Sequence, residues 1–175
     1  MASQEIADAL QRAASVLSRR PSAGLHQDAP ATVRWEGGLR MACRDPSGAT
    51  VQTDMPAEFG GTGDQVSPGW LLRAGLAACL ATCIATAAAR RQIALTALEV
   101  IASSRSDARG LLGLTEPDGS AVDAGPRDVQ LHVRIAARGV ASERLRDLVN
   151  ECQERSPVSL ALQNAVSIAL HVDAE

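Results

Sequence analysis

The chain contains no lysine and no tyrosine, and its only aromatic residues are Trp35, Phe59 and Trp70. Proteins that hold single-stranded nucleic acid stack bases on aromatic side chains within a basic groove, whereas this chain carries a formal net charge of −3. We therefore expect no nucleic-acid partner. The three histidines and four cysteines lack the spacing of metal ligands, so we expect no metal, and we expect no organic cofactor.

We also expect no targeting segment. The first residues lack the basic flank and apolar block of a signal peptide. The longest apolar stretch, residues 74–89, is bounded by arginines and consists mostly of alanine and threonine. It is shorter than the roughly 20 strongly apolar residues that cross a bilayer. We expect a cytoplasmic protein with no membrane partner, whose cysteines are reduced and do not form a disulfide framework.

The composition is that of one globular domain, with 175 residues of which 46% are hydrophobic and 21% charged. Residues 5–20 carry apolar side chains at helical spacing, and Pro21 ends that pattern. We predict that residues 1–30 form an amphipathic helix and a linker, and that residues 31–175 form the main domain.

The order of elements predicts an α+β fold of the form β(3)-α-β(2)-α(2)-β. Gly37-Gly38 and the turn 45–48 separate three short runs that we interpret as an antiparallel meander. Ser67 and Pro68 begin a long helix, which is apolar on nearly all sides and which we expect to be the buried axis of the fold. The remaining predictions are strands at 95–104, 129–137 and 167–173, a long loop at 107–126, and helices at 142–155 and from Ser156 onward.

Cys79 lies about three turns into the long helix, and its residue type allows two interpretations. A cysteine in an alanine-rich helix is often a small, inert core residue. A reactive thiol instead needs a nearby cation or a helix N-terminus to lower its pKa, and Cys79 is too far along the helix for the N-terminus. The candidate cations are Arg34, Arg40 and Arg73.

Three motifs in order resemble the OsmC/Ohr family of thiol-dependent hydroperoxide reductases. The first is Trp35-Glu36-Gly37-Gly38-Leu39-Arg40 in the meander. The second is the glycine-rich run at 60–63 followed by Ser67-Pro68 and then Leu76-Ala77-Ala78-Cys79. The third is Ser156-Pro157-Val158-Ser159, where the family normally has Cys-Pro-Val-Ser. The resemblance covers about residues 31–173.

This resemblance implies an intertwined homodimer with long central helices and a thiol site near the subunit interface. It implies that Cys79 is the peroxidatic cysteine and that Arg40 is the arginine that stabilises its thiolate. In the family the thiolate becomes a sulfenic acid, a second cysteine forms a disulfide with it, and a dithiol restores the pair.

Two positions depart from the family pattern. Ser156 stands where the resolving cysteine is expected, and a hydroxyl cannot form a disulfide. Gly69 stands where the family has the glutamate that orients the arginine. Cys83, one helical turn after Cys79, and Cys152, one turn before Ser156, are possible replacements for the resolving thiol, although both are also typical core residues.

Two functions from different classes follow. The first is thiol-dependent reduction of organic hydroperoxides in the oxidative stress response, with an altered cycle. The alternative is a non-catalytic dimer that binds a small apolar or thiol-reactive ligand.

Overall fold

The structure is a computed structural model that describes residues 3–164 and 166–174. These residues form two compact units, one of residues 8–74 and the other of residues 3–7 and 75–174. The predicted boundary at residue 30, between the N-terminal helix with its linker and the main domain, is not tested by these two units and stays a prediction. The α+β class is confirmed, because short antiparallel sheets combine with separate helices.

The first unit contains the predicted meander. Strands β1 (Thr32–Gly37), β2 (Arg40–Arg44) and β3 (Thr50–Thr53) pair antiparallel in that order. Gly37 and Gly38 have φ angles of 106° and 56°, a conformation that favours glycine over residues with a side chain. A bridge from Thr53 to Val66 then returns the chain to the edge of the sheet.

Two helical segments precede the meander, and a third follows it. Helix α1 (Ser3–Arg19) confirms the predicted amphipathic helix, and the 3-10 turn η1 (Pro21–Gly24) begins where Pro21 was expected to end it. After β3, the 3-10 turn η2 (Ala57–Phe59) opens the glycine-rich loop.

Helix α2 (Pro68–Arg90) is the long helix that the sequence predicts. Its start follows the expected capping rule, because the Trp70 N–H donates to the Ser67 hydroxyl at 3.2 Å. Pro68 occupies the first turn, where a missing backbone N–H costs nothing. The helix begins in the first unit and continues into the second.

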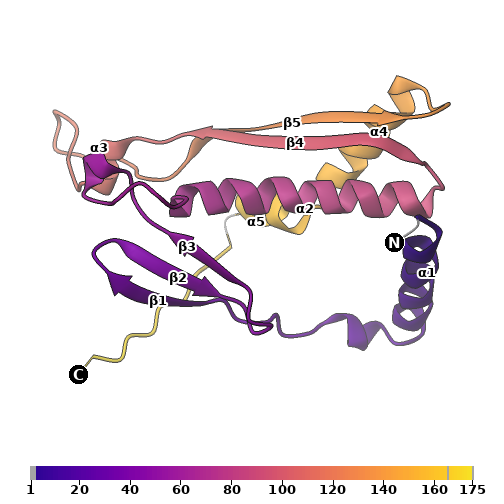
Figure 1. Cartoon of the computed structure of the whole chain (residues 1–175), viewed down its shortest axis with the longest axis horizontal. Coiled ribbons are helices and arrows are strands. Elements are labelled where there is room, and N and C mark those ends of the chain that lie inside the picture. The colour runs from indigo at the N-terminus through magenta and orange to yellow at the C-terminus, as the bar shows by residue number, and fades with distance from the viewer. Residues whose placement is uncertain (1–2, 165, 175) are drawn as a thin grey trace. The chain divides into compact units, whose positions relative to one another are not determined.

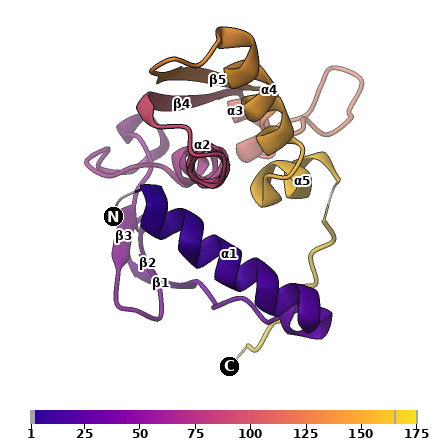
Figure 2. The ribbon, with the colours of Figure 1, turned by 90° about the vertical axis from the view of Figure 1, so that its right-hand side faces the viewer.

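The second unit packs a two-stranded sheet and two helices around α2. Strands β4 (Leu95–Arg105) and β5 (Arg127–Ala137) are antiparallel and run along α2, while helices α4 (Ser142–Gln153) and α5 (Pro157–Gln163) lie beside it (Figures 1 and 2). The core of this unit comes from α2, α4 and the segment before β4, and its fully or nearly fully buried members are Leu80, Ile84, Ala88, Ile93, Leu145, Leu148 and Cys152.

Helix α2 contributes buried residues to the core, and in this chain its burial is concentrated on one face. The buried positions are Leu76, Leu80, Ile84, Ala88 and Ala89, which form essentially one row at four-residue spacing. A single row is buried because one hairpin and two helices cover only part of the cylinder. Other apolar side chains of α2 stay in contact with solvent.

By length and composition alone, α2 is the one helix in the described residues that could cross a membrane. It has 23 residues and a mean hydropathy of 1.7 in its most apolar window, which is more than the 16-residue stretch considered above. Core helices of folded domains meet the same criterion, and the row from Leu76 to Ala88 packs in a core of this kind. The absence of a membrane partner stays a prediction.

Two local expectations differ from the structure. Residues 167–173 form no strand, and the side chains of Ile168, Leu170 and Val172 are 93%, 83% and 74% exposed. An alternating sequence forms a strand only where a neighbouring strand accepts its backbone hydrogen bonds, and within residues 3–164 and 166–174 no strand pairs with this segment. The predicted loop 107–126 contains a short helix, α3 (Ala108–Leu111), which Asp107 caps by accepting from the Arg109 N–H.

Candidate functional site

Cys79 and Ser156, taken from two separate motifs, lie against each other in the second unit. The Ser156 hydroxyl donates to the Cys79 sulfur at 3.3 Å. Ser156 is fully buried, whereas Cys79 is partly exposed. Pro157 begins α5 directly after Ser156 and so fixes the serine at the start of that helix. The residue at the family's second-cysteine position therefore contacts the candidate nucleophile.

Two further thiols adjoin this pair. Cys83 is hydrogen-bonded to Cys79. Burial is the main cause that raises the pKa of the Cys83 thiol, and the neighbouring Cys79 raises it further. Burial also raises the pKa of the Cys152 thiol, with a smaller contribution from Cys83 and partial opposition from Arg91. All four cysteines are free. Cys83 and Cys152 are therefore protonated and weakly nucleophilic near neutral pH.

Arg40 lies in the first unit, where one nitrogen of its guanidinium donates hydrogen bonds to three acceptors. Its Nη2 atom donates to the Thr62 hydroxyl at 2.9 Å, to Asp54 at 3.5 Å, and to Asp64 in a short ion pair. The hydrogen bond from Arg40 is the main cause that lowers the pKa of Asp64 to about 2. The orientation of Arg40 is thus set by two carboxylates.

Asp54 also shapes the glycine-rich loop. Its side chain is 2% exposed and accepts from the Met55 and Thr62 N–H groups and from the Thr62 hydroxyl. The Thr62 hydroxyl is the main reason that the pKa of Asp54 is lowered. The loop passes so closely that a Cβ atom on Gly61 would stand 1.8 Å from the Met55 carbonyl oxygen, which only glycine avoids.

Gly69 occupies the first turn of α2, where the family glutamate is expected. A Cβ atom there would lie 3.7 Å from Nη1 of Arg73, an ordinary contact distance. The position therefore has room for a side chain, but glycine supplies no carboxylate.

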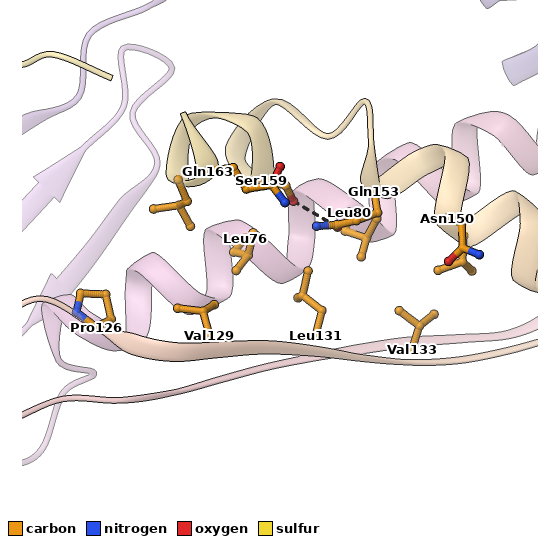
Figure 3. Close-up of a pocket in the computed structure, with 12 residues that line it drawn as sticks. Leu76, Leu80, Pro126, Val129, Leu131, Val133, Asn150, Gln153, Ser159 and Gln163 are labelled. Carbon is orange, nitrogen blue, oxygen red and sulfur yellow. Dashed lines mark hydrogen bonds between the residues drawn. The ribbon is translucent and has the colours of Figure 1, made fainter. Parts of the chain in front are cut away.

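An apolar cavity of about 500 Å³ lies beside the thiol site in the second unit. Figure 3 shows Val129, Leu131 and Val133 of β5 facing α2 across this space, with α4 and α5 closing it. Its polar edge includes Gln153, which accepts a hydrogen bond from the Ser159 hydroxyl at 3.2 Å. This geometry suits a small, mainly apolar molecule with a polar end.

The structure brings together four of the predicted site residues, namely Cys79, Cys83, Cys152 and Ser156. Arg40 and Gly69 lie in the other unit. Asp54 and Asp64 were not predicted as partners of Arg40, although their positions beside a glycine-rich loop that follows a strand were a usable signal. No group of three or more metal-ligating side chains occurs among the described residues.

Comparison with solved structures supports the fold. An OsmC-like protein from Mycoplasma pneumoniae has a TM-score of 0.65 and 18% identity, over 79% of this chain and 89% of that one. An OsmC-like protein from Vibrio cholerae has a TM-score of 0.63 and 12% identity, over 81% and 94%. An organic hydroperoxide resistance protein from Legionella pneumophila has a TM-score of 0.54 and 23% identity, over 79% and 91%.

Sequence comparison gives a more specific result. No curated protein matches the chain. Residues 61–171, which include Cys79 and Ser156 and make up more than half of the chain, match the model of the OsmC-like proteins. The chain therefore belongs to the OsmC-like protein family.

Proposed function

We propose that this protein reduces organic hydroperoxides and that Cys79 is the thiol that reacts. The observation that carries the proposal is the 3.3 Å contact between Ser156 Oγ and Cys79 Sγ. Two positions 77 residues apart in sequence meet where the family resemblance requires a peroxidatic and a resolving residue. Structural relatives described as organic hydroperoxide resistance proteins support the same substrate class.

The chemical step needs only the thiol and the peroxide. The Cys79 thiolate attacks the outer oxygen of the hydroperoxide, an S–O bond forms and the O–O bond breaks. The alkoxide leaves with a proton from solvent as the alcohol, and Cys79 becomes a sulfenic acid. Sulfur is oxidised by two electrons and the peroxide is reduced by two. The Ser156 hydroxyl donates a hydrogen bond to the reacting sulfur.

Regeneration of Cys79 cannot pass through Ser156, because a hydroxyl forms no disulfide. The i,i+4 spacing of Cys83 places its Cβ about 5–6 Å from that of Cys79, beyond the roughly 3.5–4.5 Å of a disulfide. We propose instead that an external dithiol acts as reductant. One thiol condenses with the sulfenic acid and releases water, and the second thiol displaces Cys79 as a thiol while the reductant becomes a disulfide.

Arg40 is assigned the role of stabilising the Cys79 thiolate, following the family resemblance. Its Nη2 is held by Asp54 and Asp64, so its orientation is set although position 69 carries no glutamate.

We also propose that the active protein is a homodimer. The support is that Ile168, Leu170 and Val172, which occupy alternate positions, are all exposed. This pattern suits a strand that lacks only a partner strand. Light scattering should give twice the chain mass of 18.2 kDa. A double variant, Ile168→Asp with Leu170→Asp, should shift the protein toward monomer, and a monomeric wild type would contradict the proposal.

The test of the reaction is consumption of an organic hydroperoxide with a dithiol reductant. The wild type should consume it faster than it consumes hydrogen peroxide, and Cys79→Ser should abolish the reaction. Cys83→Ser and Cys152→Ser should each keep most of the activity. Equal inertness of the wild type and Cys79→Ser would overturn the enzymatic proposal.

The second candidate function is binding of a small apolar molecule without chemistry, and the cavity between α2 and β5 favours it. A fluorescent fatty-acid analogue should then bind the wild type and Cys79→Ser equally well. Leu131→Gln, which places an amide in the apolar wall, should weaken that binding. Failure of the analogue to bind the wild type would remove this candidate.

A further inference from the structure

A second cavity lies beside the last two turns of α2, and it differs from the apolar cavity in chemistry. Its volume is about 340 Å³, within the range of small-molecule sites. Cys83 and Arg90 line it from α2, and Arg91 follows directly after that helix. The other side chains that determine its chemistry are Glu151 and Cys152 of α4 and Arg155 just beyond it.

The cavity carries a net positive charge, although the net charge of the whole protein is negative. Its three arginines and one glutamate leave a net charge of +2, whereas the whole chain has −3. Arg91 forms an ion pair with Glu151, which neutralises both. Arg90 and Arg155 form no ion pair within the described residues. These two guanidinium groups are therefore free to bind an anion.

A thiol lines the same cavity. Cys83 is partly exposed there, whereas Cys152 is 5% exposed and belongs to the core. A molecule held by Arg90 and Arg155 would thus meet Cys83 first. Because the Cys83 thiol is mostly protonated near neutral pH, its reaction with a dilute reagent is slow, and docking beside it compensates by raising the local concentration.

We propose that this cavity binds small anionic disulfides, and that Cys83 is the residue with which they undergo thiol–disulfide exchange. The Cys83 thiol loses its proton to solvent, and its sulfur attacks one sulfur of a low-molecular-weight anionic disulfide. That S–S bond breaks, a new S–S bond joins Cys83 to half of the reagent, and the other half leaves as a thiolate. Cys83 is oxidised and the leaving half is reduced.

This proposal does not depend on peroxide reduction at Cys79. The two sites use different sulfurs, and the cavity beside Cys83 is lined by neither Cys79 nor Ser156. We therefore design the test in a Cys79→Ser background. The tryptic peptide 74–90 then contains Cys83 as its only cysteine, and mass spectrometry follows that residue alone.

The probes are two thiosulfonates of similar size and opposite charge, 2-sulfonatoethyl and 2-(trimethylammonio)ethyl methanethiosulfonate. Each rate constant at Cys83 is divided by that of the same reagent with a free thiol in solution. The anionic reagent should be favoured about tenfold or more, since about 1.4 kcal/mol of attraction corresponds to a factor of ten. The preference should shrink between 0.05 and 0.5 M salt as the charges are screened.

The deciding variant is Arg90→Gln with Arg155→Gln, which should bring the preference close to one. The matched control is Arg144→Gln with Arg146→Gln, which makes the same charge change on the exposed face of α4 and should retain the preference. An equal rate for the two reagents in the Cys79→Ser protein would overturn the proposal. An equal loss of preference in both double variants would also overturn it, because the effect would then come from overall charge.

Discussion

The Oγ atom of Ser156 lies 3.3 Å from the Sγ atom of Cys79, with the serine fully buried and donating the hydrogen bond. The residue at the expected position of the resolving cysteine therefore contacts Cys79 but carries a hydroxyl oxygen in place of a sulfur. A serine here keeps the hydrogen bond to the sulfur but cannot form a disulfide, so the proposed sulfenic acid at Cys79 would need another thiol for its reduction.

Ser156→Cys should restore an internal resolving thiol. A disulfide needs an S–S length of about 2.05 Å, and a small side-chain rotation closes the gap from the present contact. Peroxide treatment should produce a bond between residues 79 and 156, detected by mass spectrometry without reduction. Ser159→Cys, another buried serine in the next turn, is the control and should form no such bond. Absence of the bond in Ser156→Cys would show that the contact is not maintained in solution.

Cys79→Ala should lower the pKa of Cys83. The Cys79 side chain raises that pKa both by its charge and by a hydrogen bond, and the substitution removes both effects. The pH profile of Cys83 alkylation, followed by peptide mass spectrometry, should move to lower pH but stay above that of a free thiol, because burial remains the larger cause. The profile of Cys43 serves as the internal control. An unchanged Cys83 profile would mean that the two thiols are not coupled.

Asp64 should stabilise the protein in a pH-dependent way. Its pKa is about 2 in the folded protein and ordinary, near 3.8, in the unfolded chain. The ionised form is thus favoured by folding, so the contribution is complete above about pH 5 and is lost as the pH falls toward 2. Asp64→Asn should lower the melting temperature most at pH 6, and the difference from the wild type should shrink as the pH falls through 2. A difference that stays constant across this range would contradict the role of the Arg40 ion pair.

Gly61→Ala should destabilise the glycine-rich loop. The added methyl group would meet the Met55 carbonyl oxygen at 1.8 Å, so the backbone must move and the contacts of Asp54 must change. We expect a loss of about 1–3 kcal/mol in the free energy of unfolding, measured by urea denaturation. Gly69→Ala, whose new methyl group stands 3.7 Å from its nearest neighbour, is the control and should be neutral or slightly stabilising in the helix.

Much of the fold was predictable because it depends on local sequence. The hairpin turn at Gly37-Gly38, the Ser67 cap of α2 and the proline that opens α5 each act within a few residues. The segment 167–173 shows the limit of this reasoning, because its apolar alternation matches a strand but a strand also requires an edge to pair with.

In the candidate site, too, some residues could be predicted from the sequence and others could not. The order and spacing of the motifs selected Cys79 and Ser156, and their contact agrees with that selection. The two carboxylates on Arg40 were not predicted, because Asp54 and Asp64 are separated from it by 14 and 24 residues. No periodicity joins positions at such separations.

The sequence by itself determined the class of fold, the family and the identity of the candidate nucleophile, because these depend on residue type and on short-range geometry. Only the tertiary structure decided which groups surround each sulfur. The association of Cys83 with Arg90 and Arg155 arises because α2 and α4 pack together through Leu80, Ile84 and Leu148. Their charged ends then meet as a consequence of burying those apolar side chains, which is a property of the packed core and of no single segment.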